Sequence, residues 1–161
     1  PFLEAFNQPG PDASCELRES STVAPQALTL LNAEEVQDRA LAFAARLVRE
    51  GNSESKTIER AFELALGRAA GKEEVELCVE RWNIATRSES QKKPVAPSFP
   101  KKIKRTVMAE KTGEPYDFWE VLPAFESYQP DLQRSDTDAR TRGLAHVCLV
   151  LFNSNEFAYL D

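Results

Sequence analysis

The residue types best suited to chemistry near the amino end lie in the stretch SCELRESST, residues 14–22. Cys15, Arg18 and Thr22 stand directly before a segment that is expected to begin a helix. Backbone N–H groups and the dipole at a helix amino end can lower the pKa of a thiol or hold an anion. The same residue types also cap helices, and we favour this structural interpretation, with the cysteine packed beneath the loop.

A second polar cluster, NSNEF at residues 153–157, follows the most apolar stretch of the chain. Asn153 or Asn155 can take the left-handed conformation that ends a helix, and Glu156 can pair with a nearby arginine. A cleft shared with Cys15 and Arg18 would instead make an enzyme site, acting on polysaccharide or in a redox reaction. We favour the structural role, because helix ends need these residue types in any case.

Two further groups have a chemical and a structural interpretation. Aromatic rings interleave with acids over residues 113–132, and pairs such as Glu114 and Asp117 or Glu120 could serve a sugar site. We expect these rings to wrap across a helical core, since so much aromatic area avoids water. The basic run at residues 101–105 could contact phosphate, but a solvated face or pairing with the acidic block is favoured.

Neither a metal nor another cofactor is expected. The single histidine, His146, stands two residues from Cys148 on an expected helix, so their side chains point roughly 200° apart. His146 is therefore expected to be a core or interface residue with a hydrogen-bonded ring. Three widely spaced cysteines make no disulfide framework, although one bridge with a free thiol is compatible with them, and no CxxCH haem-attachment sequence occurs.

The elements that must position these residues are organised around residues 140–159. From Leu144 to Phe152 every residue except His146 is apolar, so the segment predicts a helix with no face for water. It is too short to cross a bilayer, which takes about 20 apolar residues. A buried central helix is therefore expected, with Ser135 or Asp136 as its N-cap.

Three amphipathic helices are predicted over residues 33–51, 55–68 and 71–88, after a short helix that Thr22 or Val23 precedes and that ends near Asn32. Their apolar residues recur at steps of three and four. The expected core-facing residues are Val36, Ala40, Phe43, Ala44, Leu47 and Val48, then Ile58, Ala61, Phe62, Ala65 and Leu66, then Val75, Cys78, Val79 and Trp82.

These elements predict one domain over residues 1–161 and an all-α fold. It would be an irregular bundle of four to five helices around the C-terminal one, with a long Pro-rich arm packed across it. A short helix is expected within the arm, from Lys101 to Lys111. The expected parts are an N-terminal loop (1–21), a helical part (22–88), the Pro-rich and aromatic arm (89–135), and the central C-terminal helix with its tail (136–161).

Composition narrows the functional classes. The 161 residues carry a net charge of −6, which argues against a dedicated nucleic-acid binder, because phosphate contacts need clustered cations. The start, PFLEAFNQPGPD, has neither the basic nor the apolar region of a secretory signal, and it begins with Pro. We interpret the chain as a processed product or a fragment of a longer protein.

Several motifs carry a family resemblance along essentially the whole chain. They are Ser14-Cys15-x-x-Arg18, STVAPQALTLLN (21–32), LALGR (64–68), KTGEPYDFWE (111–120), YQPDL (128–132) and RGLAHVCLVLFNSNEFAYLD (142–161). In their order and spacing they resemble a planctomycete-specific domain family of unknown function. In that family the domain usually forms the C-terminal part of large exported proteins that also carry a cytochrome-c-like domain and a second uncharacterised domain.

The resemblance implies an extracytoplasmic parent protein whose other domains are the partners of this chain. It implies no activity. Each conspicuous polar cluster has a sufficient structural explanation, so we expect a non-enzymatic structural or interaction module. The alternative is the enzyme domain with a site near Cys15, Arg18 and Glu156. Binding of an anionic polymer through residues 101–105 is a third, remoter hypothesis.

Overall fold

The computed structural model describes residues 28, 30–125 and 127–158. The elements in chain order are α2 (Glu34–Arg49), α3 (Glu54–Leu66), α4 (Lys72–Ser90), β1 (Lys102–Met108), β2 (Pro115–Val121), the 3-10 helices η2 (Pro123–Phe125) and η3 (Arg134–Asp136), α5 (Ala139–Phe152) and α6 (Asn155–Ala158). Residues 28 and 30–32 are helical and agree with the predicted first helix, most of which lies outside the described residues.

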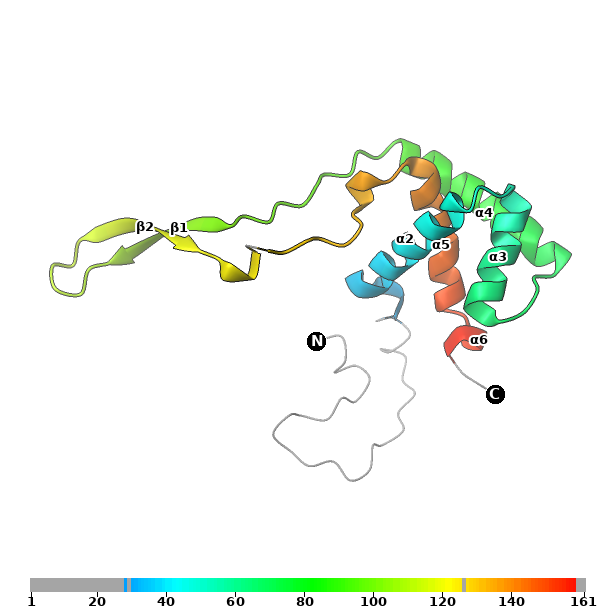
Figure 1. Ribbon diagram of the computed structural model, residues 1–161, viewed down its shortest axis with the longest axis horizontal. Coiled ribbons are helices and arrows are strands. Elements are labelled where there is room, and N and C mark those ends of the chain that lie inside the picture. The colour runs from blue at the N-terminus through cyan, green and yellow to red at the C-terminus, as the bar shows by residue number, and fades with distance from the viewer. Residues whose placement is uncertain (1–27, 29, 126, 159–161) are drawn as a thin grey trace, which may run out of the picture.

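Helix α5 is the centre of the helical body, as the sequence predicts. Leu144, Val147, Cys148 and Leu151 are buried, and the helix contacts α2, α3, α4 and α6. Figure 1 shows α5 flanked by these helices. One narrow face does remain open to water, because Val150 is 58% exposed.

The three amphipathic helices supply the surrounding layer, and the predicted stripes are confirmed with small shifts. Among their predicted residues, Ala40, Ala44, Leu47, Ile58, Ala61, Phe62 and Trp82 are buried. Leu41 and Thr57 are also buried, although neither belongs to a predicted stripe. Both adjoin predicted positions, so each buried face is one residue wider than the predicted stripe.

The close packing of α4 on α5 depends on Gly143. A Cβ atom at this position would lie 2.3 Å from Oγ1 of Thr86 and 2.8 Å from its backbone nitrogen. The two helix backbones therefore approach where no side chain intervenes. Nearby, the indole N–H of Trp82 donates to the carbonyl oxygen of Arg140 at 2.8 Å, which fixes the register of the two helices.

The N-cap of α5 is Asp138, so the prediction of Ser135 or Asp136 is wrong. The Asp138 carboxylate accepts a hydrogen bond from the backbone N–H of Thr141 at 2.7 Å. Ser135 and Asp136 belong to the short helix η3, which turns the chain just before α5. Aspartate is as good a cap as serine, and the register of the buried face decides which residue takes the position.

The arm contains a β-hairpin where a helix was predicted between Lys101 and Lys111. Strands β1 and β2 pair antiparallel, with Lys102 opposite Val121 and Met108 opposite Pro115. The turn between them places Gly113 at φ 68°, a conformation that glycine adopts without strain. The apolar residues of β1 fit a helical spacing equally well, but the β-branched and aromatic content of the two segments favours strands.

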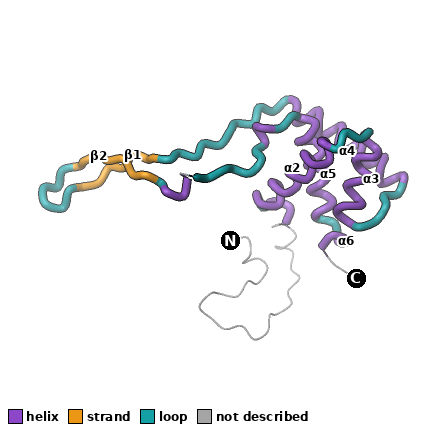
Figure 2. Tube along the Cα trace, viewed as in Figure 1, coloured by secondary structure: helices purple, strands orange, loops and turns teal. Residues whose placement is uncertain are grey.

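The hairpin does not pack across the helical body, so this part of the predicted architecture is wrong. Figure 1 shows it at the end of two extended segments that lead away from the helices, and Figure 2 shows the helices gathered at the opposite end. The rings of Phe99 and Tyr128, one from each segment, lie 5.0 Å apart. The fold is thus mostly helical with a small projecting sheet, rather than strictly all-α.

Candidate functional site

The most concentrated group of charges in the described part of the chain surrounds Glu89, near the end of α4. This side chain is fully buried. Its Oε1 accepts hydrogen bonds from Nζ of Lys92 at 2.9 Å and lies 3.1 Å from Nε2 of His146. Its Oε2 accepts from Nη2 of Arg134 at 2.7 Å and from Nε of Arg142 at 3.1 Å. Four donors therefore saturate one carboxylate.

Arg142 joins three segments of the chain through this group. Besides Glu89, its guanidinium donates to the carbonyl oxygens of Arg134, at 3.2 Å, and of Thr137. It also reaches the carbonyl oxygen of Glu89 at 3.3 Å. The end of α4, the 3-10 helix η3 and the first turn of α5 are thereby held together at the base of the arm.

The Glu89 carboxylate is held in its charged form. Burial by itself would raise its pKa, but the hydrogen bonds from Lys92 and His146 and the charge of Arg134 outweigh this effect and lower the pKa to about 2. The Glu89 carboxylate is therefore deprotonated at any physiological pH. It acts by its fixed negative charge and does not serve as an acid or a base.

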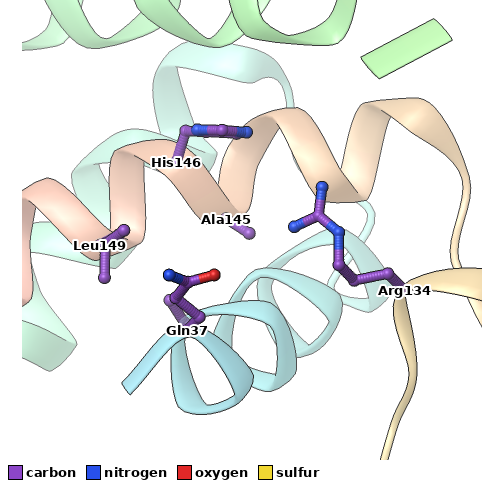
Figure 3. A pocket seen from close by; sticks show the side chains of 6 residues that line it. Gln37, Arg134, Ala145, His146 and Leu149 are labelled. Carbon is purple, nitrogen blue, oxygen red and sulfur yellow. The ribbon is translucent and has the colours of Figure 1, made fainter. Parts of the chain in front are cut away.

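A pocket opens beside this charged group, between α2 and α5. Its volume is about 40 Å³, and its walls are Gln37, Ala40, Arg134, Ala145, His146 and Leu149. Figure 3 shows the Arg134, His146 and Gln37 side chains around one space, from η3, α5 and α2 respectively. The pocket presents hydrogen-bond donors to a small polar group. Its six lining residues include no nucleophile paired with a base.

A second ion-pair group involves Arg68, from the LALGR motif. Its guanidinium donates to Glu74 at 2.8 and 2.9 Å and to Glu156 at 2.5 and 2.9 Å, and it lies 5.3 Å from the centre of the Phe62 ring. The hydrogen bonds from Arg68 and from the Gly71 backbone lower the pKa of Glu74 to about 2. This group fixes α6 against the connection between α3 and α4.

Comparison with known proteins identifies the family. Residues 1–82 match the family model PSD1, described as a protein of unknown function (DUF1553). The match covers just over half of the 161 residues. The chain belongs to this family. No curated protein and no solved structure matches it. The resemblance to a family of unknown function is thereby confirmed, whereas planctomycete origin and a cytochrome-c-like neighbour stay predictions.

The predicted site residues of this PSD1 chain fall into two sets. Cys15, Arg18 and Thr22 lie outside the described residues, so both interpretations of them stay predictions: the favoured helix cap, and the alternative enzyme site shared with the 153–156 segment. In the second set, Glu156 pairs with an arginine as predicted, its partner being Arg68.

The two asparagines of that second set serve the end of α5. Asn153 is the C-cap of this helix, and its side-chain amide donates to the carbonyl oxygen of Leu149 at 2.8 Å. Its φ of −100° is not left-handed, so for this residue that part of the prediction is wrong. Asn155 is the first residue of α6. Both residues therefore lie at helix ends, as the structural interpretation has it.

The sugar-site hypothesis paired Glu114 with Asp117 or Glu120, and both of these partner acids form ion pairs across the hairpin. Asp117 pairs with Lys104 at 2.6 Å, and Glu120 pairs with Arg105. Asp117 and Glu120 are an odd number of residues apart on β2, so they lie on opposite faces of the hairpin. Glu114 precedes β2, and its pairing with either acid in a sugar site stays a prediction. The pairing of the basic run with the acidic block is confirmed.

The cysteines and the histidine of the described segments take structural positions. Cys148 is buried and Cys78 is half-buried, both thiols are free, and burial raises the pKa of each. His146 hydrogen-bonds Glu89, in agreement with the predicted interface role. Within the described ranges no group of three or more His, Cys, Asp or Glu side chains could hold a metal ion. In the same ranges none of the helices is long and apolar enough to span a membrane.

Sequence reasoning missed the Glu89 group. One signal was available: Glu89 follows Trp82 and Ala85 at helical steps of three and four, so it continues the buried face of α4. An acid in that position requires buried cations. Nothing in the sequence indicated which ones, because Arg134 and Arg142 lie 45 and 53 residues further along the chain.

Proposed function

We propose that this domain is a non-enzymatic interaction module whose projecting hairpin docks onto another domain of the same parent protein. The observation that carries the proposal is the uncovered hairpin. Trp119 is 65% exposed, Tyr116 is 53% exposed, and Met108, Phe118 and Val121 are exposed as well. Isolated two-stranded hairpins are marginal in water, and such a concentration of apolar area on a projecting element is typical of a contact surface.

Charge indicates the kind of surface that lies beside the hairpin. The hairpin, residues 102–121, carries four Lys and Arg and four Asp and Glu, whereas residues 92–101, which lead into it, carry three lysines and no acid. The hairpin itself is therefore neutral, and the excess positive charge lies in the segment that leads to it. A partner surface that is apolar where it meets the hairpin and rich in carboxylates beside residues 92–101 would complement both.

The resemblance supports placing that surface within one polypeptide. Related domains end large exported planctomycete proteins with a cytochrome-c-like domain and a further uncharacterised domain, so a neighbouring domain is always at high local concentration. In this proposal the parent protein is extracytoplasmic. The helical body anchors the hairpin through the Glu89 group at the base of the arm, and the hairpin makes the contact.

The test compares the 161-residue chain with the longer parent polypeptide. The chain has two tryptophans, of which Trp82 is buried and Trp119 is exposed. We expect acrylamide to quench Trp119 strongly in the isolated chain and weakly in the parent protein. The amides of residues 102–121 should also exchange more slowly in the parent.

A Trp119→Phe variant assigns the signal, because only the constant emission of buried Trp82 remains in it. Equal quenching of Trp119 and equal exchange in both proteins would refute the proposal. Protection that appears in the isolated chain only as its concentration rises would indicate that the hairpin contacts a second copy instead, which would also contradict it.

A further inference from the structure

The charged group around Glu89, beside the pocket, contains more positive charge than the buried carboxylate needs. Lys92, Arg134 and Arg142 are three permanent cations around one carboxylate. Asp138 lies near Arg142 and offsets part of the excess, as the effect of Arg142 in lowering the pKa of Asp138 indicates. Arg142 is buried and uses its donors on Glu89 and on backbone oxygens. The remaining excess of positive charge therefore lies on the partly exposed side of the Glu89 group, where Arg134 is.

Arg134 directs that excess into the pocket. Its side chain is 43% exposed, lines the cavity and uses Nη2 on Glu89, whereas its Nη1 bonds to no described residue. His146 also lines the cavity, but its Nε2 faces the Glu89 carboxylate and carries the N–H, which leaves Nδ1 of the neutral ring as an acceptor. Gln37 faces them from α2 (Figure 3). A volume of about 40 Å³ holds roughly two or three water-sized atoms, which suits the two oxygens of a carboxylate.

A larger groove of about 460 Å³ shares Gln37 and Arg134 with the pocket. Its apolar wall is Leu41 from α2 and Pro94, Val95 and Pro97 from the arm; the other lining residues are Glu34, Asp38 and Gln133. A ligand with its charged end at Arg134 would thus have apolar surface beside its body. Glu34 and Asp38, the two acids of the groove, would lie beside the body of such a ligand and disfavour a second negative charge on it.

We infer that the pocket and groove between α2 and the arm bind a carboxylic acid with an apolar body, its carboxylate held by Arg134 and Gln37. The chemistry is that of a free medium-chain acid or of the carboxyl terminus of an apolar peptide. The site lies between the helical body and the first residues of the arm, and it includes no residue of the hairpin, so it is independent of the proposed docking contact.

The test is an NMR titration of the ¹⁵N-labelled 161-residue chain with hexanoate, acetate, 1-hexanol and inorganic phosphate at constant ionic strength. We expect hexanoate to shift the amides of Gln37, Ala145 and Leu149 together with the side-chain Nε–H of Arg134. Acetate should bind about tenfold more weakly, because it lacks the methylenes that the groove would cover. Hexanol, which has no charge, should leave the Arg134 signal in place.

N-acetylleucine distinguishes the two sources of the carboxylate. Tighter binding than hexanoate would assign the site to peptide termini, and weaker binding to free acids. Phosphate acting at lower concentration than hexanoate, or shifts confined to exposed lysines of the arm, would overturn the inference in favour of general anion attraction.

Three variants separate the pocket from the overall charge. Gln37→Leu touches the pocket and not Glu89, and it should weaken hexanoate binding about fivefold through the loss of one hydrogen bond. Lys92→Met removes a cation from Glu89 outside the pocket, and it should keep the affinity within about twofold. Arg134→Met should abolish binding, with the spectrum of the free variant establishing that it is folded. Equal losses in Lys92→Met and Arg134→Met would overturn the inference, as would unchanged binding in Gln37→Leu.

Discussion

At the scale of single residues, Glu89 places a full negative charge where water does not reach, and four donors stabilise it there. The exchange Glu89→Gln keeps the shape but leaves the buried Arg142 cation without its carboxylate. Uncompensated burial of a charge is expensive, so we expect a loss of about 3–5 kcal/mol in the free energy of unfolding. Urea denaturation followed by circular dichroism measures it.

The matched control at the same carboxylate is Lys92→Met. Lys92 is 54% exposed and donates to the same Oε1, but water can solvate it in either state. An exposed partner contributes about 0–1 kcal/mol, so this variant should be nearly as stable as the wild type. A loss as large as that of Glu89→Gln would mean that the pairing is dominated by the surface cation rather than by the buried arginine.

The lowered pKa of Glu89 makes this contribution dependent on pH. In the unfolded chain the group has its ordinary value of 4.5, and in the folded chain about 2. A depressed folded value stabilises the protein above the unfolded pKa, and the stabilisation disappears as the pH falls from about 4.5 to about 2. The stability difference between wild type and Glu89→Gln should shrink over that window. A difference that stays constant there would contradict a charged Glu89 in the folded state.

At the residue scale, a contact can be predicted from the sequence only when its two partners lie close together along the chain. Capping by Asn153 could be predicted, because the unpaired carbonyl groups at a helix end are satisfied by residues next to them in the sequence. The pairing of Glu156 could be predicted only as to residue type, since Arg68 is 88 positions away. Glu89 was missed altogether because three of its four partners, Arg134, Arg142 and His146, come from a region that meets α4 only in the folded chain.

At the scale of elements, the contact between α4 and α5 allows a sharp prediction for Gly143→Ala. Alanine favours a helix by about 1 kcal/mol over glycine, so helix propensity alone predicts stabilisation. The added Cβ would meet Thr86 at 2.3, 2.8 and 2.9 Å, however, and two of these three atoms are backbone. We expect a net loss of about 1–3 kcal/mol, because overpacking forces the helices apart. Thermal unfolding of the variant gives the sign directly.

The exchange Thr86→Ala tests the origin of that loss. It removes Oγ1, a buried atom that has no hydrogen-bond partner within the described residues, but it leaves the Thr86 backbone in place. In the double variant Gly143→Ala with Thr86→Ala we therefore expect partial recovery only. Full recovery would show that the side chain, and not the close approach of the two backbones, requires glycine at this position.

Helices were predictable at this scale and the hairpin was not. The stripes of α2, α3 and α4 repeat over three or more turns, and each buries against α5, so local periodicity and tertiary packing agree. Ile103, Val107 and Met108 in β1 fit a helical step, and they have no helical partner to pack against. In the structure, pairing with β2 satisfies the backbone of this segment instead.

At the scale of the whole molecule, the aromatic rings of the arm were expected to cover the helical core, but the four helices already do so among themselves. The prediction that α5 is the central helix is confirmed, because the amphipathic faces of α2, α3 and α4 are sufficient to enclose it. The position of the arm could not be predicted, since apolar content indicates that a segment will be covered and not by which molecule. The same ambiguity is the basis of the docking proposal.

If the helical body is complete without the arm, the hairpin can be removed without unfolding it. The backbone N–H of Leu122 donates to the carbonyl oxygen of Lys101 at 2.9 Å, so these two residues lie side by side and a two-residue Gly-Gly link can replace 102–121. We expect the melting temperature of the shortened chain to lie within about 3 °C of that of the 161-residue chain, because the deleted residues bury no helical surface. It should also lose the Trp119 emission. A large fall in melting temperature would mean that the hairpin supports the helices in solution, and its role as a docking element would then have to be abandoned.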